Sequence, residues 1–155
     1  MITIILKTHV KAPILTVFDI SRDITEHEAS TKNTSEKAIA GVTSGKINLG
    51  ETVTWRAKHF GFYLKHTSII SEFESPTFFV DEMVQGVFKS LRHEHIFKET
   101  NNQTEMVDVF KYEVPCGIFG QLFNYLILKS YLTKFLQKRN QHIKQRAELL
   151  NLTIY

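Results

Sequence analysis

The feature that most constrains the fold is the last long segment, 118–150, which contains no proline and a single glycine, Gly120. Leu, Phe, Lys, Gln and Arg dominate it, a composition typical of helices. A helix of about 30 residues is roughly 45 Å long, so it needs a broad apolar surface to pack on. Side chains recur at helical spacing on two neighbouring stripes: Phe119, Leu122, Leu126 and Thr133 on one, and Leu132, Leu136, Ile143, Ala147 and Leu150 on the other.

The two halves of this helix differ in character. From 118 to 136 the segment is apolar almost all round, whereas the part beyond Lys138 is basic and amphipathic. The basic half is typical of a solvated face or of cations near a helix C-terminus, with contact to a membrane surface as the alternative. The apolar half is compatible with the protein core, a pocket wall or the contact surface of a homodimer.

Length and composition predict one globular domain over 1–155. The chain has 155 residues, of which 43% are hydrophobic and 23% charged, enough for a sizeable core. A formal charge of +3 is too mild to indicate nucleic-acid binding. Cys116 is the only cysteine in the sequence, which fits a reducing cytosol. The sequence has neither a signal segment nor an apolar run long enough for stable membrane insertion, so we expect a cytoplasmic protein.

The first hundred residues alternate in the manner of strands. A strand over 2–10 is followed by Pro13, which is suited to open a short helix, and by a second short helical turn at 21–24. We expect a loop over 25–36 and then strands at 38–47, 52–60, 63–73, 77–85, 88–98 and 105–114. Short polar connections make these strands antiparallel neighbours. The pattern predicts an α+β fold in which a curved sheet wraps around the long terminal helix.

Several stretches carry a resemblance to a known family: GETVTWRAKHFG (50–61), FVDEMVQGVF (79–88), RHEHIF (92–97), DVF (108–110) and PCG (115–117). With the order of elements, they resemble the helix-grip fold of the START and polyketide-cyclase superfamily (SRPBCC). The chain is most similar to its bacterial cyclase/dehydrase-like ligand-binding proteins. The resemblance covers nearly the whole chain. It implies a cavity between sheet and helix that holds an apolar small molecule.

Strand alternation places an unusual set of polar residues on the concave face of this sheet. Aligning the aromatic-rich faces puts there Trp55, His59, Asp81, His93, His95 and Asp108. We expect Asp108 to share one polar cluster with His93, because an isolated buried carboxylate is very costly. Three roles are open: a structural network, a cluster that orients one end of a ligand, or a His–Asp pair acting as general acid and base in a cyclase or dehydratase.

A metal site requires more ligands than the sequence identifies. His93 and His95 lie on one strand face, but no further histidine or cysteine has convincing spacing, so we predict neither metal nor cofactor. His9, His27, His66 and His142 are interpreted as surface or loop residues. The predicted ligand-binding residues are Trp55, His59, Phe79, Asp81, Met83, His93, His95, Asp108, Phe110, Tyr112, Leu122, Phe123 and Leu126.

Overall fold

The computed structural model describes residues 1–153. Its helices and strands follow one another in the order β1 (Ile2–Val10), α1 (Ile14–Ser21), α2 (Ile24–Ser30), β2 (Lys37–Gly41), β3 (Thr52–His59), β4 (Phe62–Glu74), β5 (Phe78–Gln85), β6 (Ser90–Thr100), β7 (Gln103–Glu113), α3 (Gly117–Phe123) and α4 (Lys129–Leu152). A short 3-10 turn (Lys32–Thr34) precedes β2, and a π-helical turn (Asn124–Leu128) joins α3 to α4. The predicted helix-grip architecture is confirmed.

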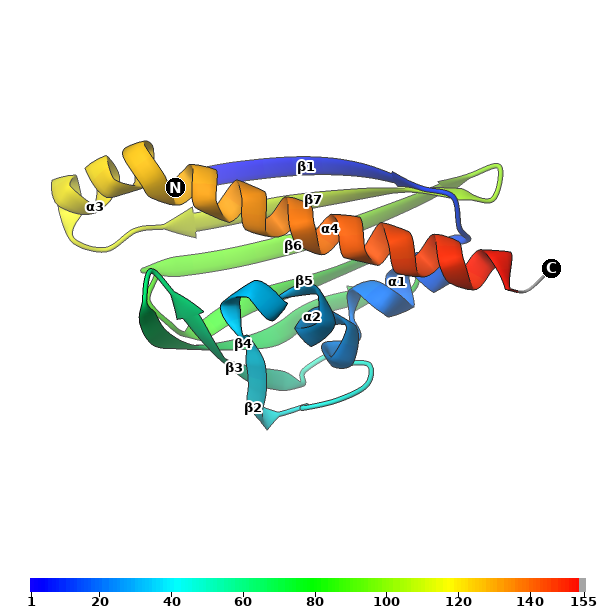
Figure 1. The fold of residues 1–155 in the computed structure, drawn as a ribbon, viewed down its shortest axis with the longest axis horizontal. Helices are drawn as coiled ribbons and strands as arrows, with labels where there is room; N and C mark the ends of the chain where they lie inside the picture. Colours follow the sequence, from blue (N-terminus) through cyan, green and yellow to red (C-terminus); the bar gives the residue numbers. More distant parts are fainter. Residues whose placement is uncertain (154–155) are drawn as a thin grey trace.

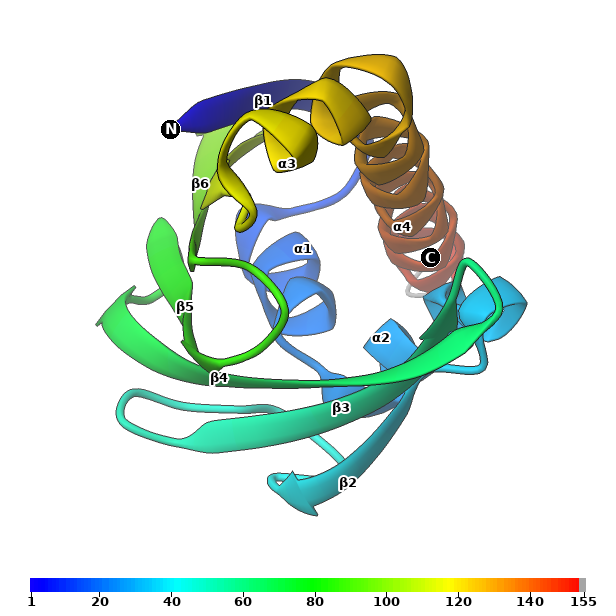
Figure 2. The ribbon, with the colours of Figure 1, turned by 90° about the vertical axis from the view of Figure 1, so that its left-hand side faces the viewer.

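The strands form a single antiparallel sheet over the described residues, in the order β1-β7-β6-β5-β4-β3-β2. Consecutive strands from β3 to β7 are neighbours because their connections are short, β2 pairs with β3 across a longer connection, and β1 pairs with β7. The sheet curls strongly, and Figure 2 shows α1, α2 and α4 on its concave side. The long helix crosses this concave side from one end of the molecule to the other (Figure 1).

The predicted terminal helix is present, but its buried face is only partly the predicted one. The stripe with Leu132, Leu136, Ile143 and Ala147 is buried, whereas Leu126 is 63% exposed. The π-helical turn contributes its buried side chains at Asn124 and Leu128, four residues apart and in line with Leu132. Leu122 and Leu126 of the other stripe therefore do not contribute to the surface that packs on the sheet. No helix within 1–153 is long and apolar enough to cross a membrane.

The segment between α1 and β3 also differs from the sequence prediction. The expected loop over 25–36 contains α2, whose first turn is capped by Asp23, the acceptor for the backbone N–H groups of Thr25 and Glu26. The expected strand over 38–47 ends early. Gly41 has a φ of +73°, a left-handed conformation that turns the chain away from the extended state.

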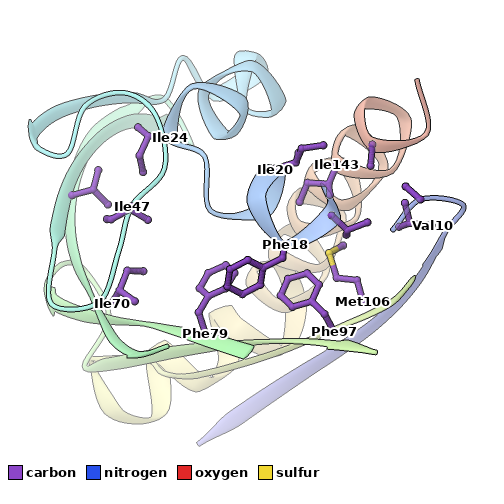
Figure 3. Packing of buried hydrophobic residues seen from close by; sticks show 14 of the residues in the cluster. Val10, Phe18, Ile20, Ile24, Ile47, Ile70, Phe79, Phe97, Met106 and Ile143 are labelled. Atoms are coloured by element: carbon purple, nitrogen blue, oxygen red, sulfur yellow. The ribbon is translucent and has the colours of Figure 1, made fainter. Parts of the chain in front are cut away.

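Two apolar clusters close the two ends of the concave sheet. Phe18 from α1 meets Phe73, Phe79 and Phe97 edge-on, with ring centroids 5.4 to 5.6 Å apart. Figure 3 shows this cluster continuing to Met106 and Ile143 of α4. The second cluster includes Phe110, Tyr112, Leu128 and Leu132 beneath the start of the long helix.

Candidate functional site

A cavity of about 560 Å³ lies between the inner face of the sheet, α1 and α2, and the long helix. Its volume is typical of sites for small molecules. Most of its lining is apolar, including Trp55, Phe79, Phe110, Leu132 and Leu136. The cavity is positioned by the curl of the sheet, which holds the helix away from the strands over part of its length.

Apolar side chains surround one end of this cavity. They come from three separate elements: the β3–β4 turn with Phe60, the β5–β6 loop with Val87, and α3 with Phe119 and Phe123. Phe119 is 79% exposed, and the other three are also exposed. Figure 2 shows α3 lying over this end of the molecule, close to the start of the long helix.

The cavity brings together about half of the predicted ligand-binding residues. Those that line it are Trp55, His59, Phe79, Asp81, His93, Phe110 and Phe123. His95 of β6 and Asp108 of β7 do not line the cavity and are fully buried. Whether any of these residues contacts a ligand stays a prediction.

The remaining predicted residues lie outside the cavity. Met83 and Tyr112 belong to the second apolar cluster, where the Tyr112 hydroxyl donates a hydrogen bond to Asn124. Leu122 and Leu126 are exposed on the outer face of the last helical segment. The prediction that Leu122 and Leu126 line the cavity is thus incorrect, because both lie on the exposed face of the helical segment rather than on its buried face.

Sheet register assembles the polar cluster at the floor of the cavity. His93 lies directly opposite Asp81 on β5, and His95 lies directly opposite Asp108 on β7. The two histidines share one face of β6 because they are two residues apart. Four chemically active side chains therefore meet from three adjacent strands, in the cluster that we call the His–Asp cluster (Asp81, His93, His95 and Asp108).

Short contacts connect the members of the His–Asp cluster. The His93 Nε2 lies 2.9 Å from Asp108 Oδ1, and the His95 Nε2 lies 2.9 Å from Asp81 Oδ2. The predicted partnership of His93 and Asp108 is thus confirmed as a direct hydrogen bond. His95 Nδ1 also approaches Asp108 Oδ1 to 2.9 Å, but without the angle of a hydrogen bond, so we treat this approach as an ion-pair contact.

Two residues of the long helix support the cluster from the other side. Asn140 donates from Nδ2 to Asp108 Oδ2 at 2.7 Å. Arg139 donates to the backbone carbonyl of Ser21 at 2.8 Å, and its Nη1 lies 3.9 Å from Asp108 Oδ1. Asp108 is therefore surrounded by four polar side chains from β6 and α4, which offset the cost of burying its charge.

The contacts decide the charge states of the carboxylates. Burial by itself would raise the pKa of Asp108, but its contacts with the two histidines hold that pKa well below the usual range. Burial would also raise the pKa of Asp81, but contacts with His95 and His93 outweigh burial and lower this pKa. The Asp81 side chain keeps 24% of its surface accessible although it lies deep in the fold, because that surface faces the cavity.

The two histidines differ in protonation. Burial lowers the pKa of His93, and the neighbouring His95 lowers it further, against the opposing effect of Asp108. Burial also acts to lower the pKa of His95, but its contacts with Asp108 and Asp81 outweigh burial and raise that pKa. His95, which lies between two carboxylates, therefore has the higher pKa of the two imidazoles.

A second polar group lines the cavity, at a distance in sequence from the first. His27 lies 3.2 Å from Glu36 through Nε2 and Oε1, and its ring stacks on Trp55 with a centroid separation of 4.3 Å. Glu36 Oε2 is buried without a hydrogen-bond partner among the described residues. His59 Nδ1 contacts the Tyr131 hydroxyl at 2.6 Å. The mostly apolar wall of the cavity thus includes this second polar group in addition to the members of the His–Asp cluster that face it.

Replacing Glu36 by glutamine should flatten the acid side of the stability profile. Burial raises the pKa of Glu36, but the charge of His27 and the hydrogen bond with it outweigh burial and lower the pKa. A lowered folded pKa contributes stability above the unfolded value of about 4.3, and this contribution is lost as pH falls through the folded value. Urea unfolding between about pH 5 and pH 3 should therefore show a larger loss for wild type than for Glu36→Gln.

The exposed Glu74 provides the matched control for this change. Glu74→Gln alters the same functional group on the outer surface, so its profile should follow that of wild type. A Glu36→Gln profile parallel to wild type would show that the carboxylate at 36 does not lower its pKa on folding.

Several residues of the site were missed by sequence reasoning. His27 and His66, interpreted as surface or loop residues, line the cavity, as do Glu36, Tyr131 and Arg139. Arg139 was assigned to the solvated basic face but is only 6% exposed. The burial of Arg139 could have been predicted from sequence, because it follows Leu136 by three residues and precedes Ile143 by four and therefore lies on the buried stripe. His27 and Glu36 had no such signal, since both lie in the segment predicted as a loop.

Comparison with solved structures identifies the fold. TTHA0849 from Thermus thermophilus is similar with a TM-score of 0.72 and 17% sequence identity, over 92% of this chain and 97% of that chain. A START superfamily protein from Mycobacterium smegmatis gives a TM-score of 0.72 at 13% identity, over 96% and 98%. The major latex-like protein 151 of Panax ginseng gives 0.65 at 16% identity, over 94% and 96%.

The sequence itself gives no closer assignment. No protein-family model matches it, and no curated protein matches it in sequence. At these low identities the structural similarity establishes the helix-grip fold alone.

Proposed function

We propose that this chain, which has the helix-grip fold of START-like proteins, binds one hydrophobic or amphipathic small molecule between the sheet and the long helix. The observation that carries this proposal is the cavity of about 560 Å³, whose wall is mostly apolar and includes a minority of polar side chains. Sites for small molecules commonly combine an apolar wall with a few polar groups that fix orientation. A lipid-like or polyketide-like molecule has this chemistry.

The lining indicates how such a molecule would be oriented. Its apolar body would lie against the rings of Trp55, Phe79 and Phe110, where burial of apolar surface supplies the affinity. A polar end would meet either His93 and Asp81 or Glu36, since these groups face the cavity. Polar atoms placed elsewhere would be buried without partners, which costs about 1–3 kcal/mol per group and gives selectivity.

Filling the cavity should abolish binding without unfolding the protein. Ala57 lies on the cavity wall, and its neighbours Arg56 and Lys58 point outward. Ala57→Trp would place an indole in the empty space. With 8-anilinonaphthalene-1-sulfonate as the probe, we expect Ala57→Trp to bind at least about tenfold more weakly than wild type, or about 1.4 kcal/mol.

The control for this test is Ile39→Trp, which adds the same ring at an exposed position outside the cavity. It should bind the dye as wild type does. Native mass spectrometry of the purified wild-type protein should also reveal a co-purified apolar molecule that Ala57→Trp lacks. Equal dye affinity in all three proteins, with no co-purified molecule, would place the dye on the exposed apolar surface and refute the proposal.

A cyclase or dehydratase activity is the second candidate. The specific observation in its favour is His93, a neutral imidazole at the cavity wall with its Nε2 held 2.9 Å from Asp108. Such a pair can take and return a proton at a ligand carbon or oxygen. The masses of co-purified molecules distinguish the two candidates. A dehydratase should carry the hydrated molecule in His93→Phe and the molecule lacking one water in wild type, whereas a binding protein should carry the same molecule in both.

Exposed apolar side chains near the end of the cavity are relevant to the prediction that the protein forms a homodimer. Leu122 and Leu126, which do not line the cavity, are exposed on the last helical segment, on a surface that a homodimer contact would cover. Homodimerisation stays a prediction from the sequence.

A further inference from the structure

Donor atoms from three side chains of the His–Asp cluster converge at the cavity floor. One potential metal-ligand atom from each of Asp81, His93 and His95 lies within 4.8 Å of the other two. Asp81 Oδ2 lies 2.9 Å from His95 Nε2 and 3.8 Å from His93 Nδ1. We propose that these three residues bind one divalent first-row transition-metal ion at the floor of the cavity.

The other ring nitrogens of the two histidines support this assignment. His93 Nε2 and His95 Nδ1 each lie 2.9 Å from the same atom, Asp108 Oδ1. Histidines that ligate a metal usually direct their second ring nitrogen to a carboxylate, which fixes the tautomer and orients the ring. Asp108 would orient His93 through a hydrogen bond and His95 through a close ion-pair contact, leaving His93 Nδ1 and His95 Nε2 as the coordinating atoms.

Asp108 is itself held in place for that task. Asn140 donates to its Oδ2 at 2.7 Å, and Arg139 lies 3.9 Å from its Oδ1. The orientation of the two imidazoles is therefore fixed from the long helix as well as from the sheet. This layered support distinguishes the His–Asp cluster from a chance group of polar side chains.

Local charge also favours a cation. Asp81 and Asp108 together carry two negative charges, and Arg139 offsets one of them, so the cluster with both imidazoles neutral has one negative charge in excess. Two imidazoles and one carboxylate suit ions such as Zn²⁺, Co²⁺ or Fe²⁺ better than Mg²⁺ or Ca²⁺, which prefer oxygen ligands.

Coordination requires only a small adjustment. Bonds to histidine nitrogen and carboxylate oxygen are about 2.0–2.2 Å long, which places donor atoms roughly 3–3.5 Å apart around one ion. Asp81 can move because its side chain faces the open cavity, while the rings stay fixed by Asp108. Asp81 and His93 both line the cavity, so the free coordination positions would open toward it and accept water or an oxygen of a bound molecule.

Metal binding at the His–Asp cluster does not depend on the binding of a small molecule in the cavity, so the test uses metal ions alone. Wild-type protein freed of metal with a chelator should bind one Zn²⁺ per chain in calorimetry. Asp81→Asn and His93→Gln should each weaken binding by more than about 100-fold, whereas Asn140→Ala, which only loosens Asp108, should cost about tenfold. His9→Ala, at an exposed histidine beside Glu105, should match wild type.

A measurement on wild type alone keeps the proposal testable if a variant fails to fold. The Co²⁺-loaded protein should show two exchangeable, paramagnetically shifted imidazole N–H resonances in its NMR spectrum, one for each ring that faces Asp108. Failure of wild type to bind Zn²⁺, unchanged affinity in folded Asp81→Asn and His93→Gln, or a Co²⁺ spectrum without shifted imidazole resonances would each overturn the assignment.

Discussion

Replacing Leu136 by aspartate should lower the free energy of unfolding by at least about 3 kcal/mol, because the carboxylate would be buried without a partner against an apolar cluster. Leu136 is 3% exposed and packs in the second apolar cluster beneath the long helix. Urea unfolding followed by circular dichroism provides the measurement. Near-native spectra are expected below the shifted midpoint, because the molecules that remain folded keep the long helix on the sheet.

Leu126→Asp is the matched control, since it makes the same chemical change ten residues earlier on the same helical segment. Leu126 is exposed, so its substitution should change stability by no more than about 0.5 kcal/mol. Equal losses in the two variants would mean that the described helix face is not the buried one.

Replacing Asp108 by alanine should cost about 3–5 kcal/mol in metal-free protein, because it leaves buried charged and polar partners without compensation. His93, His95 and Asn140 all direct polar atoms at Asp108, and Arg139 lies nearby. Thermal and urea unfolding of the variant beside wild type measure the loss. The result would establish how far the His–Asp cluster serves as a structural network in addition to any ligand or metal role.

Asp19→Ala provides the comparison at the protein surface. Asp19 also contacts two cationic side chains, with Arg22 Nη2 at 2.9 Å and Lys46 Nζ at 2.6 Å. Solvent screens these partially exposed pairs, so the loss should stay within about 1 kcal/mol. A similar cost at both positions would contradict the importance that we give to burial at Asp108.

The proposed small molecule and the proposed metal ion would occupy different parts of the cavity. A bound apolar molecule needs the volume beside Trp55 and Phe79, whereas a metal ion needs only the convergence of Asp81, His93 and His95. Loss of dye binding in Ala57→Trp with retained Zn²⁺ binding would separate the two sites experimentally. Free coordination positions that face the cavity would also allow both to be occupied together.

The class of the fold and the faces of most central strands could be predicted from sequence pattern. Alternation in 88–98 and 105–114 placed His93, His95 and Asp108 on one concave face, and the structure has them there because a strand offers only two faces. The same reasoning located Trp55 and Phe110 on the cavity wall. Local periodicity was sufficient for these residues because the aromatic side chains of their strands gather on one face, whereas both faces of 77–85 are apolar and left the orientation of Phe79 less clear.

The buried face of the first half of the long helix became evident from helix docking alone. Between 118 and 136 apolar side chains occur almost all round the helix, so periodicity favoured no face, and the π-helical turn set the alignment through Asn124 and Leu128. Tertiary structure also decided the partners in the polar cluster. Strand register brought Asp81 opposite His93, and helix docking brought Arg139 and Asn140 to Asp108. Register and docking depend on contacts between residues far apart in the chain, which the spacing within any one segment does not encode.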